Sequence, residues 1–166
     1  MTLKLIGCIL ITLSSTTFGL NYIKNIKTRV FALNEIMELI NTMKIKISYE
    51  FCDIPNLLHS LSGKYLIARQ CHMHLIDCET LQVAWNKSID EYASVMHLKA
   101  EDVRILRDLC MSLGQTDIDG QISNLNMYSN IIEENYKKAN LELNSKSRVI
   151  FSTSMFAGLL ISIILI

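Results

Sequence analysis

Two uncharged apolar stretches, one at each end of the chain, constrain its fold more than any other feature. Residues 5–20 read LIGCILITLSSTTFGL and residues 149–166 read VIFSTSMFAGLLISIILI. A helix that crosses a bilayer needs about 20 apolar residues, with about 17 as the lower limit. The first stretch reaches this length when it is extended to residues 3–22. We therefore predict transmembrane helices at 3–22 and 149–166, with a separate domain at 23–148 between them.

Each stretch also has an alternative interpretation. The first could be a cleaved signal peptide, because Lys4 precedes an apolar core, but no cleavage site of small residues follows it and the helical pattern continues. The second could be a buried core helix, although eighteen uncharged residues at the end of a chain favour a membrane span. Two membrane spans remain the preferred interpretation.

Positive charges flank the two apolar stretches on the side of the central domain. The flanking residues are Lys24, Lys27, Arg29, Lys137, Lys138, Lys146 and Arg148. Beyond the spans there is only Lys4 with the terminal amine. Because positively charged residues favour the cytosolic side of a membrane, we expect residues 23–148 in the cytosol.

Composition excludes several classes of protein. Sixteen Lys and Arg residues balance sixteen Asp and Glu residues, so no basic surplus favours nucleic-acid binding. One Pro, six Gly and few aromatic residues argue against an all-β fold rich in turns. The five cysteines are odd in number and contain no C-x-x-C pair, which suits a reducing compartment.

The central domain shows helical periodicity from end to end. Apolar residues recur at steps of three and four in two long segments, which Lys44 and Ser129 interrupt at one position each. They are Ile23, Ile26, Val30, Leu33, Met37, Ile40 and Ile47 in the first segment, and Ile118, Ile122, Leu125, Ile132, Tyr136, Ala139 and Leu143 in the second. Such seams predict two long antiparallel helices whose apolar faces are buried against each other and against the helices between them. We therefore predict an all-α bundle of about five to six helices, flanked by an N-terminal and a C-terminal transmembrane helix.

Shorter helices are expected between the two long ones. Asp53 and Pro55 indicate the start of one short helix, Ser62 and Gly63 indicate its end, and Thr80 indicates a later break. Glu101 and Asp102 indicate the start of another helix, which Gly114 should follow in the left-handed conformation. Thr116 is the expected cap of the last helix.

One cluster, Cys71, His74 and Cys78, resembles a metal or thiol site, because these residues share a helical face. Its spacing matches no familiar zinc pattern, and small cysteines on a core face are the ordinary explanation. The chain also contains neither G-x-x-x-x-G-K-[ST] nor G-x-G-x-x-G. We therefore predict no catalytic residue, no metal, no cofactor and no small-molecule substrate. A small membrane-bound metal- or thiol-dependent enzyme using Cys71, His74 and Cys78 remains the alternative.

The segment 113–121, LGQTDIDGQ, contains more polar residues than a simple helix connection needs. Gly114 and a cap suffice for the turn, and this leaves Asp117 and Gln121 one helical turn apart. Gly114, Asp117 and Gln121 are therefore candidate partner-binding residues. A hydrogen bond that fixes the junction is the other explanation.

Taken in order along the chain, several segments resemble the stage III sporulation protein AB family of endospore-forming bacteria. They are LKLIGCILI, IKISYEFCDIPNLL, Trp85, EDVRILRDLCMSLGQTDIDGQ and the final FAGLLISIILI. The block L-x-x-x-L-G-x-(S/T)-D-x-x-x-Q is the most specific. One departure is Lys99 or Ala100, where a Ser cap is expected before Glu101.

The resemblance implies a non-enzymatic subunit in the mother-cell membrane, with its bundle facing the cytosol, within the complex that builds a feeding channel to the forespore. The family's helical domain is similar to the cytoplasmic domain of platform proteins in type II secretion and type IV pilus machines. The implied partners are the ATPase-like stage III sporulation protein AA and, further out, the ring-forming subunits AG and AH.

The charge pattern makes a prediction about topology. A cysteine introduced in the 55–65 region should not react with a membrane-impermeant thiol reagent in intact cells, because this region should face the cytosol. Labelling after permeabilisation is the control. Labelling of intact cells at this position would show that the orientation is reversed.

Overall fold

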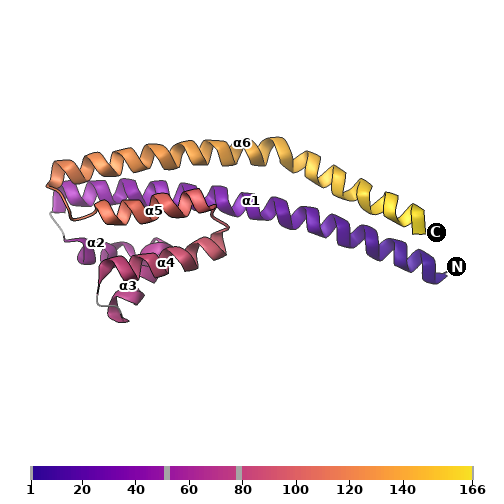
Figure 1. Ribbon diagram of the computed structural model, residues 1–166, viewed down its shortest axis with the longest axis horizontal. Helices are drawn as coiled ribbons and strands as arrows, with labels where there is room; N and C mark the ends of the chain where they lie inside the picture. The colour runs from indigo at the N-terminus through magenta and orange to yellow at the C-terminus, as the bar shows by residue number, and fades with distance from the viewer. Residues whose placement is uncertain (1, 51–52, 78–79, 166) are drawn as a thin grey trace. The chain divides into compact units, whose positions relative to one another are not determined.

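The computed structural model describes residues 2–50, 53–77 and 80–165. Within these residues the secondary structure consists of helices without a strand. The helices are α1 (Thr2–Glu50), α2 (Ile54–Leu61), α3 (Leu66–Asp77), α4 (Leu81–Met96), α5 (Ala100–Ser112) and α6 (Ile118–Leu165) (Figure 1). The prediction of an all-α fold with two long helices is confirmed.

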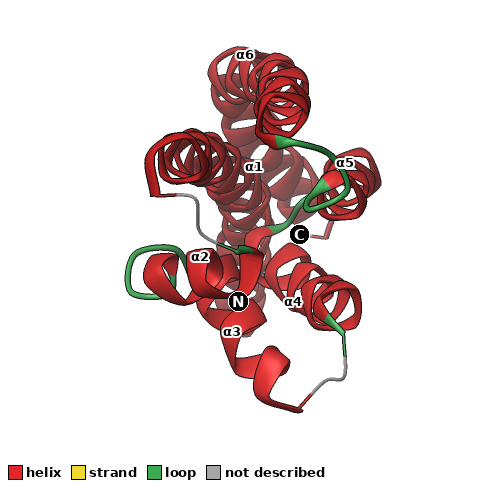
Figure 2. Ribbon diagram, turned by 90° about the vertical axis from the view of Figure 1, so that its left-hand side faces the viewer, coloured by secondary structure: helices red, strands yellow, loops and turns green. Residues whose placement is uncertain are grey.

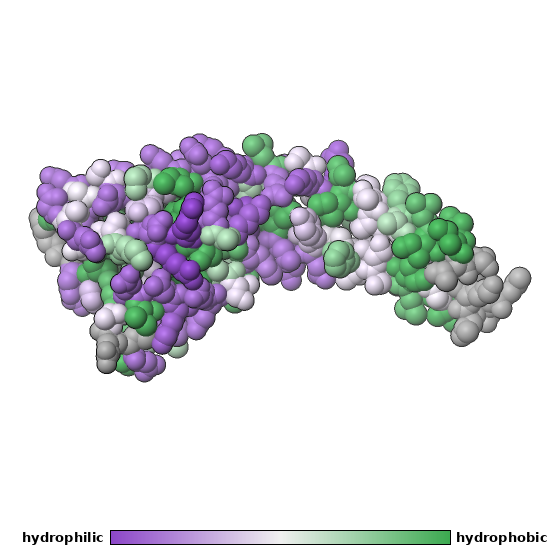
Figure 3. All heavy atoms as spheres, viewed as in Figure 1, coloured by the Kyte–Doolittle hydropathy of each residue, from purple (hydrophilic) through white to green (hydrophobic). Residues whose placement is uncertain are grey.

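The chain forms two compact units, and α1 and α6 contribute to both. The bundle unit is Arg29–Lys137, and the apolar unit combines Met1–Thr28 with Lys138–Ile166. Figure 3 shows hydrophobic colour gathered over the apolar unit and mostly hydrophilic colour over the bundle unit.

By length and composition, α1 and α6 can each cross a membrane. Their most apolar windows have mean hydropathies of 1.4 and 1.7, and only 6% and 11% of these windows are buried. A core helix of a soluble protein would be mostly buried, whereas here large apolar side chains such as Phe18 and Ile164 are exposed. These properties indicate association with a membrane.

Small residues bring the two helices of the apolar unit close together. The Ser15 hydroxyl donates to the Ser154 carbonyl at 2.6 Å, and the Ser162 hydroxyl donates to the Cys8 carbonyl at 3.1 Å. A Cβ atom at Gly158 would lie 3.0 Å from the Thr12 Cα. Close backbone approach through small residues is typical of helix pairs in membranes.

In the bundle unit, α1 and α6 are also antiparallel. The Lys44 Nζ atom donates to the Asn126 Oδ1 atom at 2.9 Å. Nearer the start of α1, Asn34 and Met37 line a shallow groove together with Tyr136 of α6. As residue numbers fall along α1, the neighbouring numbers on α6 rise, which confirms the predicted direction of pairing.

The buried face of α1 differs from the predicted seam. Leu33, Ile40 and Ile47 are buried as predicted, but Val30 and Met37 are only half-buried. The fully buried stripe also includes Ala32, Ile36, Leu39 and Met43. The reason is that α1 of the bundle unit contacts α3, α4, α5 and α6, so its apolar face is wider than a seam between two helices requires (Figure 2).

Most of the predicted helix boundaries are confirmed. Asp53 and Pro55 begin α2, the Thr80 side chain accepts a hydrogen bond from the first turn of α4, and Gly114 has a φ of +75°. The predicted Thr116 cap is wrong. The adjacent residue, Asp117, caps α6 instead, because its Oδ1 atom lies 3.1 Å from the Gly120 N–H group.

The buried face of α1 makes a prediction about stability. Leu33→Asp should lower the free energy of unfolding by several kcal/mol, since it places an unpaired charge at a position with no exposed surface. Phe31→Asp, at a side chain that is 62% exposed, should change it by less than about 0.5 kcal/mol. Thermal unfolding of the detergent-solubilised protein measures both, and equal melting temperatures would contradict this packing.

Candidate functional site

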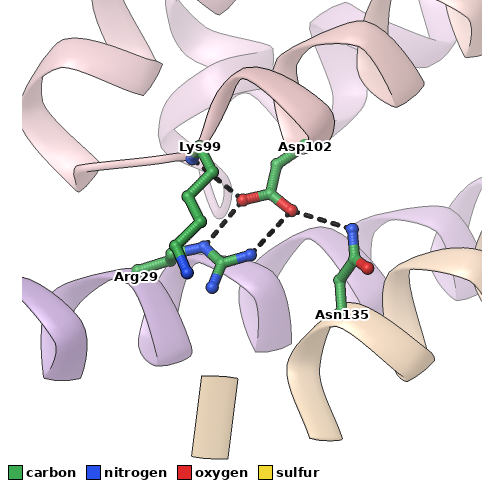
Figure 4. A network of polar contacts seen from close by, with 4 residues as sticks. All are labelled: Arg29, Lys99, Asp102 and Asn135. Carbon is green, nitrogen blue, oxygen red and sulfur yellow. Dashed lines mark hydrogen bonds and ion pairs between the residues drawn. The ribbon is translucent and has the colours of Figure 1, made fainter. Parts of the chain in front are cut away.

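A buried ion pair joins α1 to α5 inside the bundle unit. The Arg29 guanidinium donates from Nε to Asp102 Oδ2 at 2.8 Å and from its terminal nitrogen to Oδ1 at 3.1 Å (Figure 4). Arg29 is 6% exposed and Asp102 is fully buried. The two parallel hydrogen bonds form the fork geometry that is strongest between arginine and a carboxylate.

Two further donors complete the surroundings of the Asp102 carboxylate. The Asn135 side-chain amide of α6 donates to Oδ1 at 2.9 Å, and the Lys99 backbone N–H donates to Oδ2 at 3.0 Å (Figure 4). Each carboxylate oxygen therefore accepts two hydrogen bonds, which offsets the cost of burying the charge. Lys99, rather than the expected serine, precedes the first turn of α5. The Lys99 backbone N–H is hydrogen-bonded by the Asp102 side chain. One carboxylate thus ties α1, α5 and α6 together.

A second carboxylate, Glu35, connects α1 to α3 and α4. Its Oε2 atom accepts a 2.8 Å hydrogen bond from the Tyr92 hydroxyl of α4, and its Oε1 atom accepts one of 3.1 Å from the Leu66 N–H group at the start of α3. Burial, together with this hydrogen bond to Glu35, raises the pKa of Tyr92. Tyr92 therefore stays protonated and acts as a donor at any physiological pH.

The predicted partner-binding residues meet at the junction between α5 and α6. Gly114 follows the end of α5 in the left-handed conformation, and Asp117 caps α6. The Gln121 side-chain amide donates to the Thr116 carbonyl at 3.0 Å. The hydrogen bonds that fix the junction, one of the two explanations offered for this block, are thus present. Gly114 and Asp117 are also exposed, and a partner contact there remains a prediction.

The proposed metal or thiol cluster is only partly described. Cys71 is buried in the core, whereas the His74 Nε2 atom lies 3.0 Å from the Glu91 Oε1 atom at the surface. Cys78 lies outside the described residues. Over residues 2–50, 53–77 and 80–165, no group of three or more His, Cys, Asp or Glu side chains is close enough to hold a metal ion. Burial also raises the pKa of the Cys110 thiol to about 11, which keeps it protonated at neutral pH.

The network around Asp102 was not predicted from the sequence. Arg29 was counted among the charges beside the first span, and Asp102 among the acidic residues that begin a helix. A signal was present in the spacing, because Asp102 shares a helical face with Leu106 and Leu109, which are buried. Arg29 likewise lies four residues before the buried Leu33. Each of these two apolar helix faces therefore contains one charged residue, and the two charges are opposite. This pattern could have indicated a buried ion pair.

Comparison with protein families gives one match that covers nearly the whole chain. Residues 4–166 match the model of stage III sporulation protein AB. The chain belongs to the stage III sporulation protein AB family. The resemblance seen in the sequence is thereby confirmed, and this member of the family is a sporulation protein with two candidate membrane helices. Neither the curated proteins nor the solved structures provided a match.

The network makes a prediction for this member of the stage III sporulation protein AB family. Asp102→Ala should lower the free energy of unfolding by about 3–5 kcal/mol, because it leaves Arg29 buried without a counter-charge. Asp108→Ala, at an exposed position on the same helix, is the matched control and should have little effect.

The double variant Arg29→Met with Asp102→Leu separates the ion pair from the packing around it. It should recover much of the stability that Asp102→Ala loses, since neither side chain then carries a buried charge. Urea unfolding of the three variants measures the difference. A cost for Asp102→Ala no larger than that for Asp108→Ala would contradict a buried network.

Proposed function

We propose that this protein is a non-enzymatic platform subunit of a secretion-like sporulation channel complex in the mother-cell membrane. In this proposal its bundle unit faces the cytosol and binds the ATPase-like stage III sporulation protein AA. The apolar unit crosses the membrane, and the ring-forming subunits AG and AH lie further from the cytosol. Membership of the stage III sporulation protein AB family supports the sporulation context.

The observation that carries the proposal is that the same two helices supply both the apolar segments and the framework of the bundle. Helices α1 and α6 each combine a membrane-length apolar segment with a segment that packs in the bundle unit. A folded body that is anchored through both of its long helices suits a docking role, because a soluble partner can bind it while it stays at the membrane.

The distribution of polar contacts points to the junction as the partner contact. The buried side chains of Arg29 and Asn135 both donate to Asp102, and these contacts hold helices together. The junction between α5 and α6 instead places Asp117 at the surface on a backbone that is fixed by hydrogen bonds. A rigid, exposed polar turn loses little conformational entropy when a partner binds it.

Substitution of Asp117 tests this contact without removing the helix cap. Asp117→Asn keeps a good cap but removes the charge, so the melting temperature should not change while recovery of stage III sporulation protein AA with the full-length protein falls about tenfold. Asp119→Asn, in the first turn of the same helix, is the matched control and should retain the partner.

Asp117→Ala completes the comparison. It should lower stability by about 1 kcal/mol because it removes the cap, and it should also reduce recovery of the partner. Recovery at the parent level from both Asp117 variants would mean that the segment is only a turn, and the partner contact would have to lie elsewhere.

A further inference from the structure

The apolar unit contains a long groove between α1 and α6. It has a volume of about 1030 Å³, and its lining includes Leu10, Phe18, Val149 and Ala157. The Ser15 and Ser154 hydroxyls that also line it donate to backbone carbonyls, at 2.6 Å and 3.0 Å. The wall of the groove is therefore mostly apolar. Its hydroxyls belong to Ser14, Ser15, Thr153 and Ser154, of which those of Ser15 and Ser154 are bonded within the protein.

One end of this groove is polar and positively charged. Tyr22 and Lys146 line that end. Residues 20–28 and 140–148 contain the cations Lys24, Lys27, Lys146 and Arg148 and a single carboxylate, Glu142. Glu142 pairs with Lys146 at 3.0 Å, which engages one of the three N–H donors of the Lys146 ammonium group. Four positive charges against one negative charge leave an excess of three.

We propose that this groove binds an anionic phospholipid, with an acyl chain along the apolar wall and the phosphate beside Lys146. The match is one of chemistry, because a long apolar groove with a basic end has the same distribution of polarity as an anionic lipid. Basic pockets between membrane helices bind the headgroups of acidic lipids in this way. The proposal goes beyond the platform function and rests on the apolar unit lying in a bilayer.

Binding of a lipid in the groove can be distinguished from the general attraction between basic residues and an anionic membrane. That attraction depends on the number of cations and not on their positions. A lipid in the groove requires Lys146, which lines it, and does not require Arg148, which is exposed and lies outside the lining. The two residues are therefore a matched pair for a test.

Native mass spectrometry of the full-length protein, released from detergent and titrated with phosphatidylglycerol or phosphatidylcholine, measures the binding directly. The parent protein should retain phosphatidylglycerol at least fivefold more than phosphatidylcholine. Lys146→Gln should remove this preference, and Arg148→Gln should keep it. Ala157→Phe should fill the groove and reduce retention of both lipids, whereas Leu160→Phe, at an exposed position outside the lining, should not.

Three results would overturn the proposal. The first is equal retention of the two lipids by the parent protein, and the second is an equal effect of Lys146→Gln and Arg148→Gln. The third is a protein dimer without bound lipid that Ala157→Phe dissociates, since the groove would then hold a helix of a second copy. Lys146→Gln changes a residue at the polar end of the groove. It therefore still tests the proposal if the Ala157→Phe variant fails to fold. Binding of stage III sporulation protein AA to the junction is measured separately and does not depend on this outcome.

Discussion

The buried carboxylate of Asp102 is the interaction on which the arrangement of the bundle unit depends. Apolar side chains on long helices can repack after a shift of one turn, but a buried charge cannot lose its partners without a large cost. Asp102 accepts hydrogen bonds from Arg29 of α1, from Asn135 of α6 and from the backbone that begins α5. These contacts fix the register of three helices at one point. Glu35 does the same for α3 and α4, through the start of α3 and the hydroxyl of Tyr92.

These polar side chains bond to other parts of the bundle unit, which is consistent with a structural role. In the described part of the bundle unit, every carboxylate oxygen of Asp102 and Glu35 accepts a hydrogen bond from another helix or its first residues. The core is filled by large side chains such as the completely buried Trp85, whose indole N–H donates to the Leu106 carbonyl at 2.9 Å. A docking platform needs a constant surface more than it needs a cavity. In the proposed function the exposed junction at Asp117 provides this surface, since a cap and a side-chain hydrogen bond define its backbone.

The sequence predicted the elements of this fold better than it predicted their contacts. Periodicity identified both long helices and their antiparallel pairing, and Pro55, Thr80 and Gly114 marked helix ends because each acts locally. The width of the buried face of α1 could not be predicted, because it depends on how many helices pack against it. The Arg29–Asp102 pair was missed for the same reason, since its members are 73 residues apart and only the tertiary fold brings them together. At the junction, the turn at Gly114 was predicted correctly, but the cap of the last helix is Asp117 and not Thr116.

The proposed function requires that the α5–α6 junction binds the ATPase-like stage III sporulation protein AA. The most direct measurement is photo-crosslinking in sporulating cells from a photoreactive residue in place of Gln115, which is exposed within the junction. The account predicts a crosslinked product that contains stage III sporulation protein AA, and a much weaker one from Arg104, an exposed position on α5 away from the junction. Crosslinking to the same partner from Arg104 but not from Gln115 would contradict the account.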